Sequence, residues 1–328
     1  MIRAAVIGAG SFGRNHIRVL SQLPGVELAA IVDVDLSRAQ QLAQEYHSQA
    51  MAALDPWAGR IEAAIIATPT ETHEAIAAQL LEAGIDVLIE KPVAETSAAA
   101  ERLARLADDR GRILQAGHLE RFNPAVRALE QALTVPLFFE VHRLSVFTPR
   151  SLDIDVVLDL MIHDLDIVLS FAGAMPEEVR AAGISVLSNK VDIANVRLSF
   201  ASGCIANLTA SRISVEQVRK LRLFQPGEYI SLDYQRQDAT RFAIRKNEPQ
   251  IGFVPQIGFE PLAVTPGEPL QLELAAFFAA VHERSRPRVD VWQASRALRV
   301  AESILAKIRE HADLVSETIR AAGQLSDS

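Results

Sequence analysis

The stretch AAVIGAGSFG, residues 4–13, decides the fold class of the first part of the chain. An apolar run leads directly into three glycines in G-x-G-x-x-G spacing, and a helical pattern follows them. In a turn between a strand and a helix, Gly8 permits the tight turn, Gly10 lets the backbone approach a pyrophosphate, and Gly13 allows close packing. The first N–H groups of the helix would face that anion. The stretch therefore predicts a dinucleotide-binding site, and the alternative is a glycine turn that holds no ligand.

The end of the second predicted strand bears on the choice of dinucleotide. Asp33 ends the strand predicted in AAIVDVD, 20 residues after Gly13. A carboxylate there accepts hydrogen bonds from the adenosine ribose and repels a 2′-phosphate. We therefore expect NAD as the cofactor, while Arg38 lies close enough in sequence to leave NADP as an alternative. The residues predicted to bind the cofactor in this region are Gly8, Gly10, Ser11, Phe12, Gly13 and Asp33.

Residues 1–120 alternate between short apolar runs and helical patterns. Continuous apolar strands separated by helices are typical of a parallel sheet that is covered on both faces. The predicted fold class is α/β, with a Rossmann domain over residues 1–120 that is built on a doubly wound parallel sheet. Its predicted strands are Ala4–Ile7, Leu28–Val32, Ala63–Ala67, Val87–Ile89 and Ile113–Ala116.

Residues 121–328 show a different pattern, in which runs that favour strands follow one another with few helices between them. They predict a C-terminal α/β domain with a large, mostly antiparallel open sheet, for substrate binding and oligomerisation. Asn247–Pro269 is rich in glycine and proline, so we expect a long loop there. A sheet with helices on one face leaves the other face to cover, which predicts a homodimer or homotetramer.

The composition excludes several kinds of partner. The chain has 328 residues, enough for two domains, and a net charge of −8, which argues against nucleic acid or an anionic membrane surface as a partner. Charges interrupt every long apolar run, so no membrane span is predicted. The opening segment suits a strand better than a signal peptide. The single cysteine, Cys204, cannot form an internal disulfide, and we expect a cytoplasmic protein.

Two further strand ends carry polar residues, and ligands of such sheets lie at the carboxyl ends of the strands. In ATPTETH, Thr68 and Thr70 offer hydroxyls to the cofactor, although Thr70 could instead cap the next helix. His73 is a further candidate cofactor contact, with packing or capping as its alternative. In IEKP, Lys91 follows an apolar strand, where an unused charge is costly. A functional role is expected for Lys91, and both Glu90 and Lys91 are predicted to contact the cofactor, with an ion pair between them as the alternative.

The segment SLDIDVVLDLMIHDLDIVLSFAGA, residues 151–174, mixes apolar residues with a few charged or polar ones. At about 100° per residue, four of these fall within a stripe roughly 80° wide on a helix. A surface helix would show the opposite proportions, with a broad polar face. The segment therefore predicts a mostly buried helix with one stripe turned towards solvent, a structural partner or a substrate. The residues of the stripe are Asp155, Asp159, His163 and Asp166.

Four segments together resemble the Gfo/Idh/MocA oxidoreductases. They are AVIGAGSFGRNH, ATPTETHEAIAAQLLEAGIDVLIEKPVAET, GHLERFNPAV and LDLMIHDLDIV. The resemblance implies a Rossmann domain, a second α/β domain with an open sheet, and a nicotinamide cofactor that serves the oxidation of a sugar or polyol hydroxyl. The segment GHLERFNPAV is most similar to segments of those members that oxidise nucleotide sugars at C3. This similarity implies oxidation of C3 of UDP-N-acetylglucosamine to the 3-keto sugar.

The family's motifs imply a catalytic set of Lys91, Asp159 and His163. In this interpretation His163 removes the hydroxyl proton, Asp159 fixes its tautomer, and Lys91 stabilises the oxyanion. No metal is expected, because Lys91 takes the role that a Lewis acid has elsewhere. Asp155 and Asp166 receive no catalytic role.

The substrate is expected to be a small molecule, and a nucleotide sugar would need cations for its diphosphate. Arginine suits a diphosphate well, although each candidate arginine has a structural role as its alternative. An inositol or free-sugar dehydrogenase of the same family is the nearest alternative function. A non-catalytic NAD-binding regulator is another, but it would not need Lys91 and His163. The predicted substrate-binding residues are Lys91, His118, Arg121, Asn123, Arg150 and His163.

Overall fold

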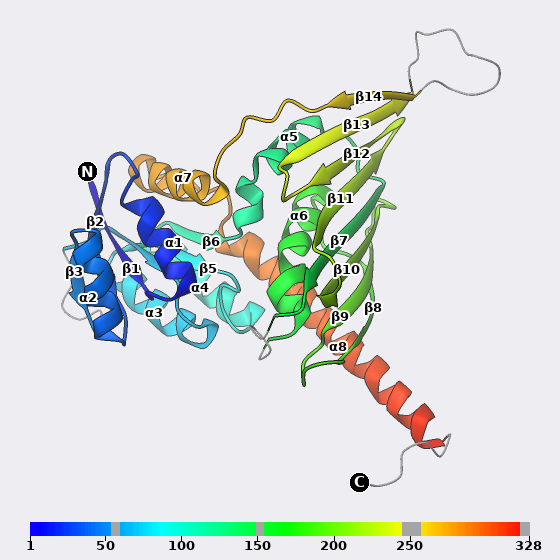
Figure 1. Cartoon of the computed structure of the whole chain (residues 1–328), viewed down its shortest axis with the longest axis horizontal. Helices are drawn as coiled ribbons and strands as arrows, with labels where there is room; N and C mark the ends of the chain where they lie inside the picture. The colour runs from blue at the N-terminus through cyan, green and yellow to red at the C-terminus, as the bar shows by residue number, and fades with distance from the viewer. Residues whose placement is uncertain (54–59, 149–153, 245–256, 322–328) are drawn as a thin grey trace. The chain divides into compact units, whose positions relative to one another are not determined.

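The computed structural model describes residues 1–53, 60–148, 154–244 and 257–321 (Figure 1). The chain divides into two compact units. The first comprises Met1–Phe122 and Gly267–Arg296, and the second comprises Asn123–Pro266 and Ala297–Ser328. The sequence placed all of residues 121–328 in the second domain. Gly267–Arg296 instead belongs to the first unit, because the apolar side chains of its helix enter that unit's core.

The first unit is an α/β structure. Its elements are β1 (Ile2–Ile7), α1 (Ser11–Leu20), β2 (Val26–Val32), α2 (Leu36–Glu45), β3 (Gln49–Met51), β4 (Ala63–Ile66), α3 (Thr70–Glu82), β5 (Asp86–Glu90), α4 (Ser97–Arg110), β6 (Leu114–Gly117), η1 (Leu119–Phe122) and α7 (Pro269–Glu283). The strands form one parallel sheet in the order β3-β2-β1-β4-β5-β6, so the predicted doubly wound sheet is confirmed. The chain order reverses between β1 and β4, where ligands of such sheets bind.

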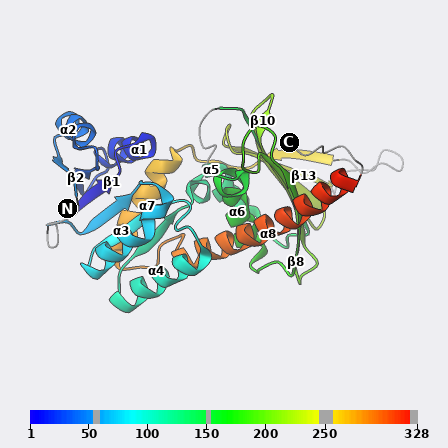
Figure 2. The same ribbon diagram turned by 90° about the horizontal axis from the view of Figure 1, so that it is seen from below.

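Helices cover both faces of this parallel sheet. In Figure 2, α3 and α4 lie side by side below the strands, and they pack against each other. Helix α1 contacts α7, and Ile17 of α1 shares a core with Val6 of β1 and with Leu274 and Phe277 of α7. Because both faces are buried, these strands need continuous apolar sequences, which is why they could be recognised.

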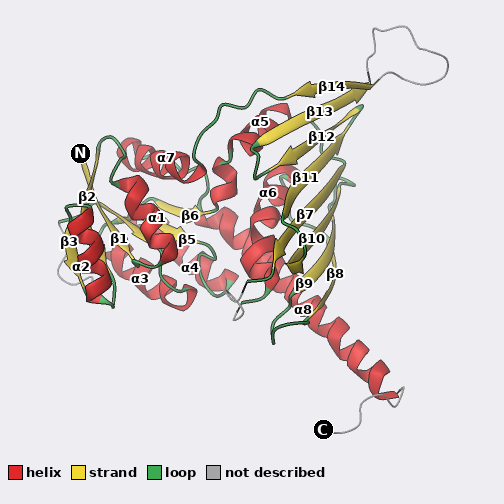
Figure 3. Ribbon diagram, in the orientation of Figure 1, coloured by secondary structure: helices red, strands yellow, loops and turns green. Residues whose placement is uncertain are grey.

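The second unit is built on an eight-stranded sheet (Figure 3). Its elements are α5 (Pro124–Ala132), β7 (Phe138–Val146), the π-helical turn η2 (Val157–Met161), α6 (Ile162–Ala172), β8 (Glu178–Ile184), β9 (Ile193–Ser199), β10 (Ile205–Ser214), β11 (Val218–Gln225), β12 (Glu228–Asp233), β13 (Asp238–Ile244), β14 (Ile257–Pro261) and the part of α8 (Val291–Ala321) that follows Arg296. The strand order is β14-β13-β12-β11-β7-β10-β9-β8. Only β7 and β10 pair in parallel among these described strands, so the predicted mostly antiparallel sheet is confirmed.

Three strands were not predicted. Strand β3 has only three residues, and β13, with the sequence DATRFAI, mixes polar and apolar positions without a clear apolar run. Strand β14 lies inside the stretch Asn247–Pro269 that was expected to be a loop. Its sequence, IGFEP, contains glycine and proline, which lower strand propensity, but β14 is an edge strand, where proline is tolerated.

The two faces of the second sheet differ. Phe139 and Val141 of β7 are buried, and Phe139 stacks on Phe171 of α6, so this face is covered by helices. Phe224 and Phe259 belong to the opposite face, where aromatic rings follow one another across five strands. These rings, which we call the aromatic ladder, are Phe138, Phe224, Tyr229, Phe242 and Phe259.

Candidate active site

The turn between β1 and α1 has a geometry that requires glycine. Gly8 has a φ of +97°, and a Cβ there would lie 2.4 Å from the backbone oxygen of Ala67. A Cβ at Gly13 would lie 1.8 Å from the oxygen of Gly8. At Gly10 a Cβ would meet no described atom within 4 Å, so a ligand can approach the backbone. Since Gly10 brings no side-chain cap, the first N–H groups of α1 can face an anion.

A cavity of about 740 Å³ opens at this turn. Its volume falls within the range of small-molecule sites, about 300–1,000 Å³. The glycine turn, the end of β2 and the end of β4 form its walls, which are the carboxyl ends at the reversal of strand order. Gly13, Thr70, His73, Glu90 and Lys91 are not among its lining residues. The predicted cofactor residues that line it are Gly8, Gly10, Ser11, Phe12, Asp33 and Thr68.

Asp33 holds the glycine turn in place from the end of β2. Its Oδ2 accepts a hydrogen bond of 2.7 Å from the backbone N–H of Ala9, and its Oδ1 accepts one of 2.8 Å from that of Asp35. Nη1 of Arg38 lies 3.6 Å from Oδ2. A carboxylate offers about four acceptor positions, so Asp33 can keep these contacts and still bind a ribose hydroxyl.

His73 ties two loops together. It is 1% exposed, with Nδ1 2.9 Å from the carbonyl oxygen of Pro92 and Nε2 2.9 Å from that of Thr68. Burial lowers the pKa of His73, although the two carbonyls act in the opposite direction. With both ring nitrogens beside backbone carbonyls, His73 links the ends of β4 and β5. This position favours the packing alternative over a cofactor contact.

Lys91 directly follows β5 and is joined to Pro92 by a cis peptide bond. Its backbone N–H donates to Oε2 of Glu90 at 3.2 Å, while Oε1 of Glu90 lies 2.6 Å from Nε2 of His16. Burial acts to raise the pKa of Glu90, but the His16 hydrogen bond and the charges of His16 and Lys91 outweigh it, and the net pKa is lowered. Glu90 therefore fixes the backbone from which the Lys91 side chain extends.

A second carboxyl lies near Glu90 and was not singled out from the sequence. Glu273 of α7 is fully buried, and neither of its carboxyl oxygens has a hydrogen-bond partner among the described residues. Nε2 of Gln115 donates to the backbone oxygen of Glu273 at 3.5 Å. Burial, and then the charge of Glu90, raise the pKa of Glu273 well above its ordinary value. Nothing in LQLELAAFF distinguishes Glu273 from an exposed helix residue, so only the tertiary packing reveals it.

Asp159 and His163 lie in the second unit, one turn apart across the junction of η2 and α6. The turn from Val157 to Met161 is π-helical, and such widened turns occur frequently at functional sites. Both side chains are half-buried, while most of α6 is buried, as the apolar sequence indicated.

Other carboxylates of this helix have structural partners. Oδ1 of Asp155 accepts a hydrogen bond of 2.8 Å from the backbone N–H of Val191. Asp164, next to His163, accepts from Nε and Nη2 of the buried Arg143 at 2.6 and 2.9 Å. The Arg143 guanidinium also lies 4.9 Å from the centre of the Tyr234 ring. This pair fixes α6 to β7 and so orients the backbone of His163.

A cavity of about 300 Å³ lies beside Asp159 within the second unit. It is lined by Arg212 of β10, by Gln217 just before β11 and by Arg219 of β11, together with Asp159 and Leu160. Neither arginine was predicted from the sequence, because each stands among ordinary strand residues.

The predicted substrate residues have varied surroundings. His118 and Arg121 belong to the first unit and are buried, and the backbone oxygen of Arg121 accepts from Nε of Arg288 at 3.2 Å. Asn123 caps α5 through a 3.1 Å bond from the N–H of Ala125, and its Nδ2 donates to the backbone oxygen of Tyr234 at 3.0 Å. These contacts give Asn123 a structural role. Arg150 lies outside the described residues.

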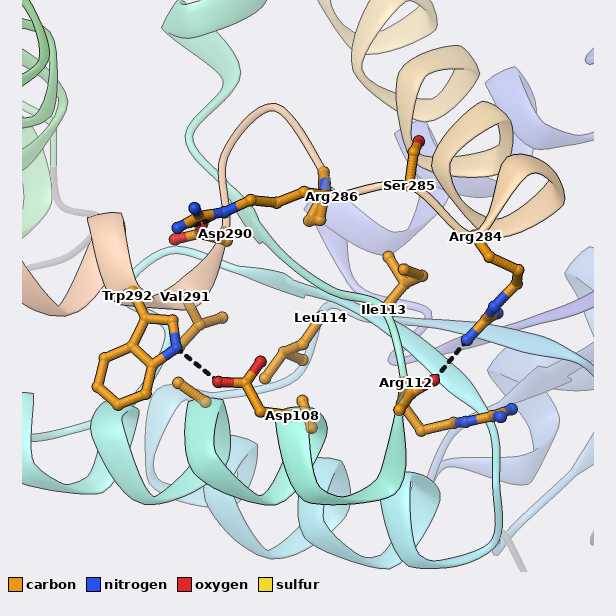
Figure 4. Close-up of a pocket in the computed structure, with 14 residues that line it drawn as sticks. Asp108, Arg112, Ile113, Leu114, Arg284, Ser285, Arg286, Asp290, Val291 and Trp292 are labelled. Carbon is orange, nitrogen blue, oxygen red and sulfur yellow. Dashed lines mark hydrogen bonds and ion pairs between the residues drawn. The ribbon is translucent and has the colours of Figure 1, made fainter.

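A further cavity of about 570 Å³ lies in the first unit, near the amino end of β6 and away from the expected cofactor position. Figure 4 shows polar side chains at its wall engaged with neighbouring groups. Nε1 of Trp292 donates to Asp108 at 2.9 Å, and Nη2 of Arg284 donates to the backbone oxygen of Gly111 at 2.7 Å. Arg286 is paired with Asp290. The contacts of Arg284 and Trp292 attach residues 284–292 to the C-terminal end of α4.

Two kinds of site are absent from the residues that the structure describes. No helix there is long and apolar enough to cross a membrane. No group of three or more histidine, cysteine or carboxylate residues there has the arrangement of a metal site.

The glycine turn, Asp33 and the doubly wound sheet define a dinucleotide-binding oxidoreductase. Residues 2–118 match the family model of the NAD-binding Rossmann fold of the GFO/IDH/MocA oxidoreductases, and residues 138–224 match a C-terminal domain of that family. UDP-N-acetylglucosamine 3-dehydrogenase of Acidithiobacillus ferrooxidans is 39% identical over 234 residues, 71% of this chain and 74% of that protein. Its solved structure superposes with a TM-score of 0.88 and 33% identity over 94% of this chain and 97% of that one.

The chain therefore belongs to the GFO/IDH/MocA oxidoreductases, as the resemblance indicated, and is a dehydrogenase of that family. Inositol 2-dehydrogenase 1 of Saccharopolyspora erythraea is 33% identical over 184 residues, 51% of this chain and 53% of that protein. The structure of a levoglucosan dehydrogenase in complex with NADH and levoglucosan superposes with a TM-score of 0.82, over 94% of this chain and 97% of that one. At 17% identity, that likeness shows the fold alone.

Proposed function

We propose that the protein oxidises the C3 hydroxyl of UDP-N-acetylglucosamine to the 3-keto sugar with NAD. The observation that carries this proposal is the similarity to the A. ferrooxidans UDP-N-acetylglucosamine 3-dehydrogenase, at 39% identity over 71% of the chain. The relative named as an inositol 2-dehydrogenase matches at 33% over a shorter part, 51% of the chain. The nucleotide sugar is therefore the better-supported substrate.

The proposed chemistry uses Lys91, Asp159 and His163. His163 accepts the hydroxyl proton, and the carboxylate of Asp159 stabilises the imidazolium that results. Lys91 donates a hydrogen bond to the same oxygen and stabilises its developing negative charge. NAD, when bound, would supply the hydride acceptor, so the hydroxyl proton would go to His163 and the hydride of the same carbon to the cofactor. Because Lys91 supplies the positive charge at the oxygen, the scheme needs no metal.

The cavity at the glycine turn fits a dinucleotide. Added Cβ atoms would collide at Gly8 and Gly13, while Gly10 leaves the backbone open to a ligand. Asp33 lines the same cavity and supports NAD rather than NADP by repelling a 2′-phosphate. Thr68, at the opposite wall, offers a hydroxyl to the cofactor.

The test is a substrate panel with purified enzyme, followed by NADH absorbance. UDP-N-acetylglucosamine, its uronic acid, myo-inositol and glucose are compared at equal concentrations. We expect the fastest NAD reduction with UDP-N-acetylglucosamine. Faster turnover of myo-inositol or glucose would establish the inositol or free-sugar alternative. If no sugar is turned over although NAD still binds, the protein would be a non-catalytic NAD-binding regulator. The presence of Lys91, Asp159 and His163 argues against this alternative.

We also propose that the enzyme is a cytoplasmic homodimer or homotetramer. The aromatic ladder supports self-association, because Phe259 is 67% exposed and aromatic side chains are enriched at interfaces. The single thiol, Cys204, is buried, which fits a reducing compartment. Light scattering during size-exclusion chromatography tests the assembly, and Phe259→Ser should shift it towards the monomer. A monomeric wild type would contradict the proposal.

A further inference from the structure

We propose that Arg212 and Arg219 bind the diphosphate of the substrate in the cavity beside Asp159. The proposal rests on the function given above and extends it to the residues that recognise a nucleotide sugar. The cavity encloses about 300 Å³, and its walls come from η2, β10, β11 and the end of β7. A substrate that reaches Asp159 and His163 with its sugar has its diphosphate only a few bonds away from the reacting carbon.

The pairing of β7 with β11 places Arg219 on the helix-covered face of the sheet. Arg219 is directly opposite Arg143 in this antiparallel pair, and opposite residues point to the same face. Arg143 contacts Asp164 of α6 on that face. Leu221 and Leu223, at alternate positions after Arg219, are fully buried there. The guanidinium of Arg219 is therefore directed towards η2 and α6 rather than towards the aromatic ladder.

Arg212 is anchored at the same cavity by contacts behind it. Its Nη2 donates to the backbone oxygen of Ile154, and its Nε lies 3.7 Å from Oδ1 of Asp192. Burial acts to raise the pKa of Asp192, but the N–H groups of Val186, Leu187 and Ser188 and the Ser188 hydroxyl lower it to about 2. Asp192 is thus an ionised anchor. A guanidinium has five N–H donors, so one side chain can serve an anchor and a ligand together.

The chemistry of these side chains suits a diphosphate. The arginine fork donates parallel hydrogen bonds to phosphate oxygens. Two guanidinium groups and one carboxylate, that of Asp159, line the cavity, while the carboxylate of Asp192 lies behind Arg212. The N–H donors of both arginines therefore lie at one wall of the cavity, in a chain whose net charge is −8. Gln217 adds an uncharged donor at the wall. A neutral polyol would gain little from this arrangement, so the two arginines would discriminate in favour of a nucleotide sugar.

The experiment is a calorimetric titration of UDP into wild type, Arg219→Gln and Arg212→Gln. Arg222→Gln is the matched control, because Arg222 lies on the same strand but on the opposite face, where it is exposed and paired with Glu140. It removes the same charge from the chain without touching the cavity. We expect Arg219→Gln and Arg212→Gln each to weaken UDP binding about ten- to a hundredfold, as for lost charge-assisted bonds. Arg222→Gln should bind UDP within about twofold of wild type.

The possible outcomes separate this inference from the proposed function. If wild type binds UDP and both cavity variants bind it as tightly as Arg222→Gln does, the diphosphate lies elsewhere and the inference is wrong, while the function stands. If wild type does not bind UDP and the substrate panel shows oxidation of a neutral sugar, the function itself fails. Melting curves check that each variant is folded. If Arg212→Gln loses its fold with its Asp192 contact, Arg219→Gln decides the question alone.

Discussion

Nε2 of His16 lies 2.6 Å from Oε1 of Glu90, although 74 positions separate the two residues in the sequence. The side chain of His16 is 1% exposed and that of Glu90 is 17% exposed. The contact joins α1, which begins at the glycine turn, to the end of β5, which carries Lys91. The contact therefore fixes the helix after the glycine turn relative to the end of β5, which the proposed catalytic Lys91 follows.

Loss of this contact should destabilise the first unit. We expect His16→Ala to lower the free energy of unfolding by about 1.5–3 kcal/mol, because Glu90 loses a hydrogen bond to its charged form. His142→Ala is a matched control, since Nε2 of His142 lies 3.3 Å from Oε1 of Glu140 but the two side chains are 42% and 33% exposed, far more than His16. That change should cost less than about 1 kcal/mol. Equal losses in urea titrations of the two variants would contradict the assigned role.

The same contact predicts a dependence on pH. The folded-state pKa of Glu90 lies below its ordinary value of 4.5, so its ionised form stabilises the fold above pH 4.5. This contribution is lost as the pH falls from 4.5 through the lower folded-state pKa. The difference in stability between wild type and His16→Ala should therefore shrink over that range. A constant difference would show that the ionisation of Glu90 is unrelated to His16.

The contacts of Asp33 and Arg38 predict opposite effects on cofactor choice. Asp33→Asn keeps an oxygen for the N–H of Ala9, which lies 2.7 Å from Oδ2, but removes the charge that repels a 2′-phosphate. We expect NADP binding to improve and NAD binding to weaken, so the preference narrows at least about tenfold, the equivalent of 1.4 kcal/mol. Arg38→Ala should lower the residual NADP affinity instead. If the ratio of the dissociation constants for NAD and NADP is unchanged in both Asp33→Asn and Arg38→Ala, these two residues do not control the choice of cofactor.

The proposed catalytic set predicts losses of turnover with little change in cofactor binding. Lys91→Ala and His163→Ala should each lower kcat by at least about a hundredfold, the low end for a positioned acid or base. Asp159→Asn should give a partial loss, because the geometry remains but the tautomer of His163 is less well fixed. Lys190→Ala, an exposed change in the second unit, is the control. Near-normal kcat in folded Lys91→Ala or His163→Ala enzyme would refute the role of that residue.

The parts of this fold that could be predicted are those specified by local sequence. Positions 8 and 13 require glycine, because a side chain there would collide with the backbone of the turn or of the segment after β4. The spacing of these glycines can be recognised in the sequence. The strands of the first sheet are continuous apolar runs because both faces are buried. Strand β14 was missed for the opposite reason. As an edge strand, it tolerates the proline and glycine that normally mark a loop.

The site residues that escaped prediction depend on contacts between distant segments. Arg219 becomes a pocket residue only because β11 pairs with β7, which places it opposite Arg143. Glu273 is buried because α7 returns to the first unit from far along the chain. Asn123 is predicted to bind substrate, and its side chain also caps α5 and donates to the backbone oxygen of Tyr234, a contact between distant segments. No local pattern distinguishes these cases from ordinary surface residues.

Glu273 should keep its proton to a higher pH in the folded protein than in the unfolded chain. Burial and the charge of Glu90 raise its pKa well above the ordinary value of 4.5. In the unfolded chain the same carboxyl ionises near 4.5, so between that pH and the higher folded-state pKa the folded state binds more protons than the unfolded state. Stability from this group is fully present below pH 4.5 and is lost progressively as the pH rises towards the folded-state pKa.

Glu273→Gln should therefore change how stability depends on pH. The amide has the size of the protonated carboxyl but cannot ionise. The free energy of unfolding of Glu273→Gln, relative to wild type, should therefore grow by up to about 1.4 kcal/mol per pH unit between 4.5 and the folded-state pKa of Glu273. Chemical denaturation of both proteins between pH 5 and pH 8, at intervals of about one unit, measures this slope. Glu283→Gln, at an exposed position of the same helix, is the control and should track the wild type. If the free energies of unfolding of wild type and Glu273→Gln depend on pH in the same way, Glu273 ionises in the folded protein as it does in the unfolded chain. The raised pKa of Glu273 would then be wrong.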